Sequence, residues 1–273
     1  MNLEPSQAIG VFDSGVGGLT VLDECLDALP AEDFVYVGDT AFFPYGDREA
    51  AEVRDRALAI GRWLVAQGVK LIVVACNTAT AVALADLQRE LGTPVIGVIQ
   101  PEVRAAVHAT RNRRVGLLAT EATARSGSYA RMVGSHDAGV VLTTVACPGL
   151  APVIQSGHSI DDGVVAMVAE YTAPLTAAGV DTVILGCTHF PMIERLLRRS
   201  LPGVTLIDGR SEIAREVAET LERKRVRRPP GAEGTRRFAC SGDPGAFRAL
   251  ASRFLQMPLG EVEVIDFPEE ARH

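Results

Sequence analysis

Lysine is almost absent from this 273-residue chain, which contains only Lys70 and Lys224. A pyridoxal phosphate enzyme needs a lysine at the centre of its site, where the side chain forms a Schiff base with the cofactor. Lys70 stands at the start of an apolar run, the wrong end of a parallel strand for a ligand site, and Lys224 lies in a basic run. The lysine content therefore argues against this cofactor, and we expect none.

Long apolar segments are missing as well. No run of about 18 apolar residues occurs, and the first residues lack the basic and apolar regions of a secretory signal. The net charge of −7 argues against general binding to nucleic acid or to an anionic membrane surface. With 47% hydrophobic residues, the chain can bury a substantial core. We expect a globular, cytoplasmic protein with a small-molecule site and with no membrane or nucleic-acid partner.

Paired cysteine motifs are also absent. The chain has five cysteines, an odd number, and no CxxC pair. This pattern indicates neither a disulfide framework nor a dithiol redox unit. We expect reduced thiols.

The chain does contain ten short apolar runs that are rich in β-branched residues. They lie at residues 8–12, 33–39, 70–76, 93–99, 114–120, 141–147, 181–187, 204–208, 236–240 and 261–267. Most are continuous rather than alternating, as in strands that are covered on both faces. Helical patterns separate many of them, for example at 48–67, 79–91 and 211–224, with Ser211 as the expected N-cap of the last. Alternating strands and helices predict an α/β fold with mainly parallel sheets.

Two parts of the sequence repeat each other at an offset of about 110 residues. AIGVFDSGVGG, from Ala8, corresponds in pattern to RVGLLATEATA, from Arg114, and VVACNTA corresponds to ILGCTHF. A diverged duplication explains both pairs, so we expect two pseudo-symmetric open domains with the active site in the cleft between them. We place the first domain at residues 1–99 plus 209–273, and the second at residues 100–208.

Open parallel sheets bind ligands beyond the carboxyl ends of their strands, so the polar residues of the loops there are the candidates for a binding site. FDSGVGG places Asp13 and Ser14 before glycines and a helix start, where backbone N–H groups can hold an anion. It matches neither a dinucleotide fingerprint nor a P-loop, and a tight turn capped by Ser14 is the alternative. After the second run, Pro44, Tyr45 and Gly46 form a turn able to present the tyrosine hydroxyl and backbone amides to a ligand, although such turns are more often structural.

Two cysteine loops are the strongest signals. Each thiol precedes two polar residues: Cys76, Asn77 and Thr78 in the first loop, and Cys187, Thr188 and His189 in the second. Because the N-terminus of a helix carries positive potential, we expect both thiol pKa values to be lowered from about 8.5 toward neutrality. A buried structural cysteine is the alternative for either one alone. Two cysteines in matched settings favour a functional pair.

Several kinds of chemistry use cysteine. Cys76, Cys187 and His189 supply three of the ligands that zinc needs, but no HExxH or paired-cysteine spacing supports a metal, and we expect none. Acyl transfer by Cys187 with His189 as its base stays open, although it leaves Cys76 unexplained. Two thiols on opposite faces of one carbon meet a different need. One removes a proton and the other returns a proton to the opposite face, which inverts a stereocentre.

The sequence resembles the glutamate racemases of the cofactor-independent aspartate/glutamate racemase superfamily. The motifs that carry this resemblance run almost end to end: GVFDSGVGGLTVL, YVGDT, PYG, ACNTATA, GTPVIGVI, VGLLATEATARSGSY, ACP, DTVILGCTHFP, LID and SGDPGAF. The resemblance implies interconversion of L- and D-glutamate for peptidoglycan precursors by a homodimer, with Cys76 and Cys187 as the two acid/base catalysts. The substrate-contacting residues that it implies are Asp13, Ser14, Tyr45, Gly46, Asn77, Thr78, Thr120, Thr188 and His189.

Some positions depart from the usual pattern of these racemases. Gln155 lies near a position where an acidic residue usually follows the ACP motif and is proposed to assist one cysteine, a task that a neutral amide cannot perform by proton transfer. An IEPG-like run is replaced by VIQPE, which contains Gln100 and Glu102, and LID is followed by Gly209 and Arg210. An aspartate or hydantoin racemase of the same superfamily and a non-catalytic amino-acid-binding protein are the alternative functions.

Overall fold

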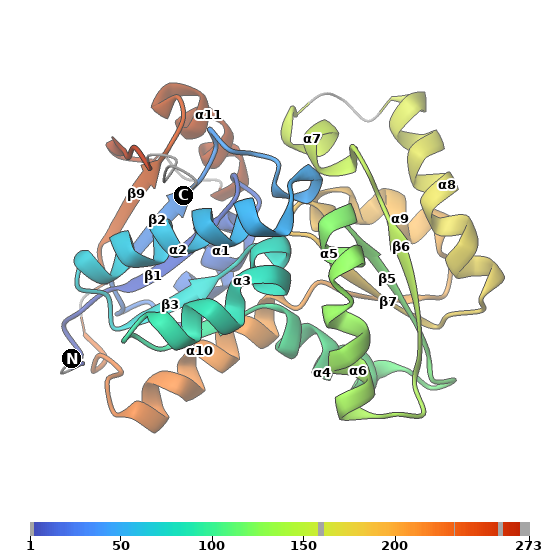
Figure 1. The fold of residues 1–273 in the computed structure, drawn as a ribbon, viewed down its shortest axis with the longest axis horizontal. Helices are drawn as coiled ribbons and strands as arrows, with labels where there is room; N and C mark the ends of the chain where they lie inside the picture. The colour runs from blue at the N-terminus through green and yellow to red at the C-terminus, as the bar shows by residue number, and fades with distance from the viewer. Residues whose placement is uncertain (1–2, 158–160, 232, 256–258, 268–273) are drawn as a thin grey trace.

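The computed structural model describes residues 3–157, 161–231, 233–255 and 259–267. Within these residues the chain forms two β-sheets with helices packed around them, and every strand pairing is parallel. The two sheets occupy the left and right halves of the view in Figure 1. The predicted α/β class with parallel sheets is confirmed.

The first sheet has six strands in the order β10-β9-β2-β1-β3-β4. Its strands are β1 (Ile9–Asp13), β2 (Phe34–Gly38), β3 (Leu71–Val74), β4 (Val95–Gly97), β9 (Arg236–Cys240) and β10 (Val262–Val264). β9 pairs with β2, beginning at Phe34 and Arg236, so the last part of the chain extends the sheet that the first part began.

The second sheet has four strands in the order β6-β5-β7-β8. They are β5 (Arg114–Ala119), β6 (Val141–Ala146), β7 (Thr182–Gly186) and β8 (Thr205–Ile207). This order matches β2-β1-β3-β4 of the first sheet strand for strand, as a duplicated half predicts. The domain boundaries at residues 99/100 and 208/209 stay predictions.

Helices connect the strands and cover the sheets. They are α1 (Leu19–Ala28), α2 (Ala50–Ala66), α3 (Asn77–Glu90), α4 (Ile99–Ala109), α5 (Glu121–Ser126), α6 (Ser128–His136), α7 (Leu150–Gln155), α8 (Asp162–Ala177), α9 (Glu194–Ser200), α10 (Arg210–Lys224) and α11 (Pro244–Leu255), with the short 3-10 helices η1 (Tyr45–Asp47) and η2 (Phe190–Ile193). Each of the ten apolar runs overlaps one of the ten strands, as predicted, and the three helical patterns correspond to α2, α3 and α10.

The beginning of α10 differs from its prediction. Ser211 is not the N-cap, because the helix starts at Arg210 and Gly209 takes the N-cap position with φ of 68°. The Asp208 carboxylate accepts the backbone N–H of Arg210 at 3.2 Å, and the Ser211 hydroxyl donates instead to the Glu212 carboxylate at 3.2 Å. A left-handed glycine after an aspartate therefore caps the helix two residues before the serine that the sequence pattern indicates.

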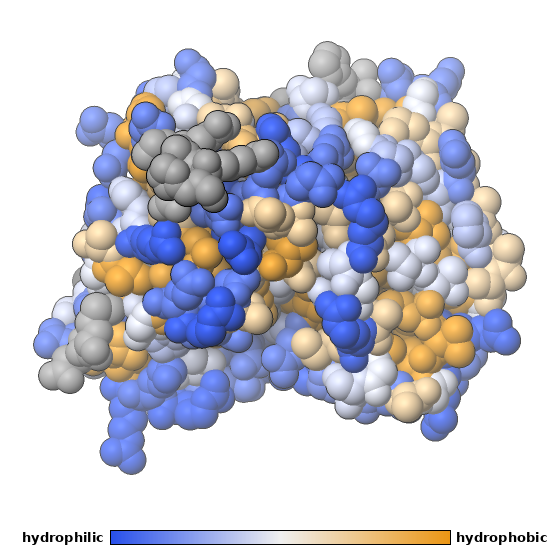
Figure 2. Space-filling model, in the orientation of Figure 1, coloured by the Kyte–Doolittle hydropathy of each residue, from blue (hydrophilic) through white to orange (hydrophobic). Residues whose placement is uncertain are grey.

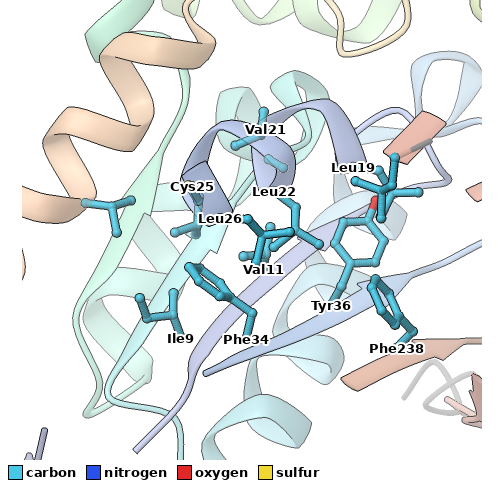
Figure 3. Packing of buried hydrophobic residues seen from close by; sticks show 14 of the residues in the cluster. Ile9, Val11, Leu19, Val21, Leu22, Cys25, Leu26, Phe34, Tyr36 and Phe238 are labelled. Carbon is cyan, nitrogen blue, oxygen red and sulfur yellow. The ribbon is translucent and has the colours of Figure 1, made fainter. Parts of the chain in front are cut away.

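Apolar residues cover both faces of the first sheet. On one face, Val11 and Phe34 lie beneath Leu22 and Leu26 of α1, as Figure 3 shows. The opposite face packs against α2 and α3, and Phe12 is one of its buried residues. Burial of apolar area stabilises such layers by about 25 cal/mol per Å². The strands are thus a rigid base for the loops at their carboxyl ends.

The surface is mixed in character. Hydrophilic side chains cover much of the face in Figure 2, and apolar side chains gather in smaller areas. In the part of the chain that the structure describes, no helix has both the length and the apolar character needed to span a bilayer.

Candidate active site

A small cavity lies where loops from the two sheets meet. It is lined by Ser14, Phe43, Pro44, Tyr45, Gly46, Cys76, Asn77, Thr78, Thr120, Ala151, Cys187, Thr188 and His189. Ten of the eleven predicted site residues are among them, and Asp13 is the exception. The cavity measures about 20 Å³, close to the room that one water molecule needs.

Cys76 stands at the end of the segment that follows β3 and caps the N-terminus of α3. Its sulfur accepts the backbone N–H of Ala79 at 3.4 Å, and its thiol faces the Ser14 hydroxyl at 3.8 Å. Burial, together with the charge of Asp13, nevertheless raises the pKa of the thiol to about 12. The expected shift toward neutrality is wrong here, because desolvation and a nearby carboxylate outweigh the hydrogen bonds at the helix N-terminus.

Cys187 follows β7 in the second sheet and is also buried. Burial raises its pKa well above the ordinary value of a thiol, and Asp13 adds to the rise, against the lowering effect of the His189 backbone N–H. The short η2 helix follows this cysteine, so Cys187 does not cap an α-helix as Cys76 does. The expected lowering of the thiol pKa is therefore wrong for this cysteine too.

Asp13 ends β1 and is fully buried. Its Oδ2 accepts the backbone N–H groups of Gly15 and Gly18, both at 3.1 Å. Its Oδ1 has no hydrogen-bond partner among the residues that the structure describes. A buried carboxylate with one unused oxygen is costly unless a donor reaches it, so this atom is a candidate contact for a cationic group of a ligand.

His189 is held in one tautomer by Gln155. Its Nε2 lies 2.9 Å from Oε1 of Gln155, and the same oxygen accepts the backbone N–H of Val16 at 3.3 Å. A backbone N–H can only donate, so the atom that faces Val16 is the amide oxygen, and Nε2 of His189, which faces the same oxygen, is assigned the proton. Nδ1 is then an acceptor, 3.8 Å from the sulfur of Cys187 and 3.4 Å from the hydroxyl of Thr188. Burial lowers the pKa of His189, which favours this neutral form.

Tyr45 contributes to the cavity wall in a different way from the one predicted. Its hydroxyl donates to the Asp39 carboxylate at 2.6 Å, and that carboxylate also pairs with Arg56 at 2.7 Å. The hydroxyl is therefore engaged within the first half of the chain and is not presented to a ligand. The neighbouring Gly46 lies tightly against Thr120, because a Cβ at position 46 would approach the Thr120 Cβ to 2.7 Å.

Asn77 and Thr78 make contacts that join the two halves. The Asn77 side chain donates to the Glu102 carboxylate at 3.0 Å and to the Tyr129 hydroxyl at 2.8 Å. The Thr78 hydroxyl lies 2.9 Å from that of Thr120. The sequence does not predict that Asn77 contacts Glu102 or Tyr129. The one feature that draws attention to Glu102 in the sequence is the VIQPE run, which we expect to differ from the racemase pattern.

No group of three or more histidine, cysteine, aspartate or glutamate side chains in the described residues is arranged to hold a metal ion. The three zinc ligands considered from the sequence thus do not form a ligand set. All five cysteines are free and buried. What the arrangement offers is two thiols from two sheets around one small cavity, with a carboxylate and a neutral imidazole beside them.

Comparison with known proteins identifies the family. A sequence model described as Asp/Glu/Hydantoin racemase matches residues 9–217. The chain belongs to this racemase family. A member from Geobacter metallireducens, a glutamate racemase, is 42% identical over 267 residues, which are 97% of this chain and 99% of that protein.

Solved structures of the racemase family share the whole fold. Glutamate racemase isoform RacE1 from Bacillus anthracis matches with a TM-score of 0.92 and 36% identity over 97% of this chain and 99% of that one. A glutamate racemase from Francisella tularensis, solved in complex with D-glutamate, matches with a TM-score of 0.90 and 30% identity over 96% and 98%.

Three of the positions at which we expect the sequence to depart from the racemase pattern, Glu102, Gln155 and Gly209, meet at the candidate site. Gln155 contacts His189, Glu102 contacts Asn77, and Gly209 leaves room for Glu102, because a Cβ at position 209 would lie 2.2 Å from the Glu102 Cγ. The two departures at 102 and 209 are thus sterically matched to each other.

Proposed function

We propose that this protein is a glutamate racemase in which Cys76 and Cys187 exchange protons with the two faces of the α-carbon. The observation that carries the proposal is the pair of buried thiols, one from each sheet, on one cavity. The substrate follows from the relatives, since the protein that is 42% identical over 97% of this chain is a glutamate racemase.

The reaction needs only proton transfers. A thiolate takes the α-proton of one enantiomer, so that the C–H bond breaks, an S–H bond forms and the electron pair moves toward the substrate carboxylate. The opposite thiol then gives its proton to the other face of the carbon and becomes the thiolate. The reverse direction uses the same two groups with their roles exchanged, and no redox change or cofactor enters the balance.

The raised thiol pKa values mean that one thiol has to lose its proton before it can act as a base. Nδ1 of His189, 3.8 Å from the Cys187 sulfur, is placed to accept that proton. The substrate ammonium group contributes as well, because a positive charge near a thiol lowers its pKa. The unused Oδ1 of Asp13 is the acceptor that we assign to this ammonium group.

The substrate carboxylates need donors. Backbone N–H groups at the start of α3 and the hydroxyls of Thr78, Thr120 and Thr188 surround the cavity. Donors of this kind stabilise negative charge as it develops on the α-carboxylate during proton removal. Since the cavity of about 20 Å³ is far smaller than glutamate, we infer that the two halves separate for the substrate to enter.

Solvent isotope exchange tests this function. In deuterated water, purified protein without added cofactor should racemise each glutamate enantiomer and place deuterium at the α-carbon of the product. Cys76→Ala and Cys187→Ala should each lower racemisation at least about 100-fold. Cys25→Ala, which alters a buried thiol of α1 away from the cavity, is the matched control. Full racemisation in either site variant contradicts the two-thiol mechanism.

A panel of other amino acids separates the alternatives within the family. We expect turnover of glutamate and little turnover of aspartate or of a hydantoin. Binding of glutamate without racemisation would indicate a binding protein.

The biological setting follows from the resemblance alone. We infer that the protein supplies D-glutamate for peptidoglycan precursors, in the cytoplasm, as a homodimer. Growth of a D-glutamate-requiring bacterium that expresses this chain tests the supply of D-glutamate. Light scattering of the purified protein tests the homodimer.

A further inference from the structure

Among the residues that the structure describes, no cationic side chain pairs with Glu102, a buried carboxyl group at the edge of the candidate site. It lies in the first turn of α4, and its two oxygens accept hydrogen bonds from two side chains. Nδ2 of Asn77 lies 3.0 Å and 3.1 Å from them, and the Tyr129 hydroxyl donates to Oε2. Because Nδ2 of Asn77 also donates to the Tyr129 oxygen at 2.8 Å, the three side chains form a closed ring.

This ring belongs to the wall of the site. Asn77 directly follows Cys76 and lines the cavity, and a second void of about 10 Å³ is lined by Asn77, Glu102 and Cys187 together. Gly209 gives the Glu102 side chain its space. Nδ2 of Asn77 is turned toward Glu102 and Tyr129, so the ring fixes the orientation of the whole amide group in the wall of the cavity.

The charges around Glu102 are mainly negative. Asp208, after β8, pairs with Arg210 at 2.7 Å, Glu212 of α10 faces the same region, and Cys187 stands at the end of β7. Farther out, Glu216 of α10 pairs with Arg104 of α4 at 3.1 Å, and Tyr129 is the titratable group from α6. Burial, with Asp208 and Glu212, raises the pKa of Glu102 to about 8, against the hydrogen bonds of Tyr129 and Asn77.

We propose that Glu102 is a positioning residue for Asn77, and that an anionic amino-acid substrate binds more tightly when Glu102 holds its proton. The proposal rests on the proposed function. A protonated carboxyl keeps accepting from Asn77 through its carbonyl oxygen, so the amide stays oriented, whereas an ionised carboxyl adds a negative charge beside a site that must hold a substrate anion.

The test is the pH dependence of KM and kcat for glutamate between pH 6.5 and about 9. Four proteins are compared: the unchanged chain, Glu102→Gln, Glu102→Ala and the matched control Glu216→Gln. Glu216→Gln removes a carboxylate from the α4–α10 contact outside the ring. Ionisation of the substrate's own ammonium group affects all four alike, so only differences between them count.

We expect KM of the unchanged chain and of Glu216→Gln to rise about fivefold or more across this range, with a smaller change in kcat. Glu102→Gln, a neutral side chain that keeps an acceptor for Asn77, should retain a low KM that lacks this rise and changes with pH only through ionisation of the substrate's ammonium group. Glu102→Ala should show a KM raised about tenfold at pH 7, because Asn77 loses its acceptor. The same KM–pH curve in Glu102→Gln and in the unchanged chain overturns the proposal.

Tyr129→Phe provides a second route if the Glu102 variants do not fold. Loss of the hydroxyl donor raises the pKa of Glu102 further, so the rise in KM should move to higher pH, and an unmoved curve contradicts the proposal. Racemisation by the unchanged chain at pH 7 tests the proposed function separately, since it does not depend on the shape of any pH curve.

Discussion

The imidazole of His189 and the side-chain amide of Gln155 are joined by a hydrogen bond of 2.9 Å, and this contact decides which nitrogen of the histidine faces Cys187. Gln155 cannot transfer a proton, but its amide oxygen accepts a hydrogen bond from Nε2–H of His189. Nδ1 is then unprotonated, and it is the group to which we assign the thiol proton. On this proposal Gln155 assists Cys187 through the histidine.

Gln155→Leu should therefore weaken racemisation although it removes no titratable group. The buried Nε2–H loses its acceptor, which costs about 1–3 kcal/mol and corresponds to roughly a 5- to 150-fold loss of kcat/KM. Because the enantiomers are equally stable, kcat/KM falls equally in both directions. The measurement that locates the defect is the primary isotope effect of α-deuterated L- and D-glutamate.

That isotope effect should become larger for the enantiomer whose α-proton goes to Cys187. Gln67→Leu, at the C-cap of α2 and not among the residues that line the cavity, is the control and should leave both isotope effects unchanged. Equal isotope effects for both enantiomers in Gln155→Leu would contradict a role that acts through Cys187.

The strands and the cysteine loops could be predicted from the sequence because they depend on local pattern. Continuous apolar runs fix which segments are buried in a parallel sheet, and a loop after such a run has to lie at its carboxyl end. Cys76 and Cys187 therefore came together at one cavity as expected, and Thr120, which only the resemblance implies, lies there too.

The contacts of those residues could not be predicted, because their partners come from distant segments. His189 and Gln155 are separated by 34 positions, and Asn77 and Glu102 by 25. The pKa values of the thiols also escaped prediction. A helix start is visible in sequence, but the depth of burial that opposes its effect depends on how the two halves close over each other.

Asp13 should hold the thiols in their protonated state. Burial and the Asp13 charge raise the pKa of Cys76 to about 12, so Asp13→Asn should lower it. We expect alkylation of Cys76 by iodoacetamide at pH 8 to be about three- to tenfold faster in Asp13→Asn than in the unchanged chain, read by mass spectrometry of the labelled peptide.

Asp23→Asn removes the same charge from the exposed side of α1 and should leave the alkylation rate of Cys76 unchanged. An equal rate in Asp13→Asn and Asp23→Asn would show that Asp13 does not control the thiol.

Asp181 should make the second half of the chain sensitive to acid. Although burial opposes the shift, hydrogen bonds from Thr110, the backbones of Asn112 and Arg111, and Thr182 lower its pKa to about 2. A group with a lowered folded-state pKa stabilises the fold above its unfolded pKa, near 3.8, and this stabilisation is lost as the pH falls toward 2. Because solvent screens this partly exposed carboxylate, Asp181→Asn should cost about 1 kcal/mol in urea unfolding at pH 7, and the difference from the unchanged chain should shrink as the pH approaches 2. A difference that is independent of pH contradicts the linkage.

Gly46→Ala should disturb turnover more than stability. A Cβ at position 46 would lie 2.7 Å from the Cβ of Thr120, so the added methyl group keeps the loop after β2 away from the loop after β5. The free protein relieves this contact by opening slightly, and we expect its free energy of unfolding to change by less than about 1 kcal/mol. Catalysis requires the closed arrangement, where a displacement of about 1 Å can lower the rate about 100-fold, so kcat/KM should fall at least about tenfold.

Gly92→Ala, whose Cβ would meet nothing within 4 Å, is the control and should match the unchanged chain in both measurements. Unaltered kcat/KM in Gly46→Ala would mean that the two walls need not approach this closely for the reaction.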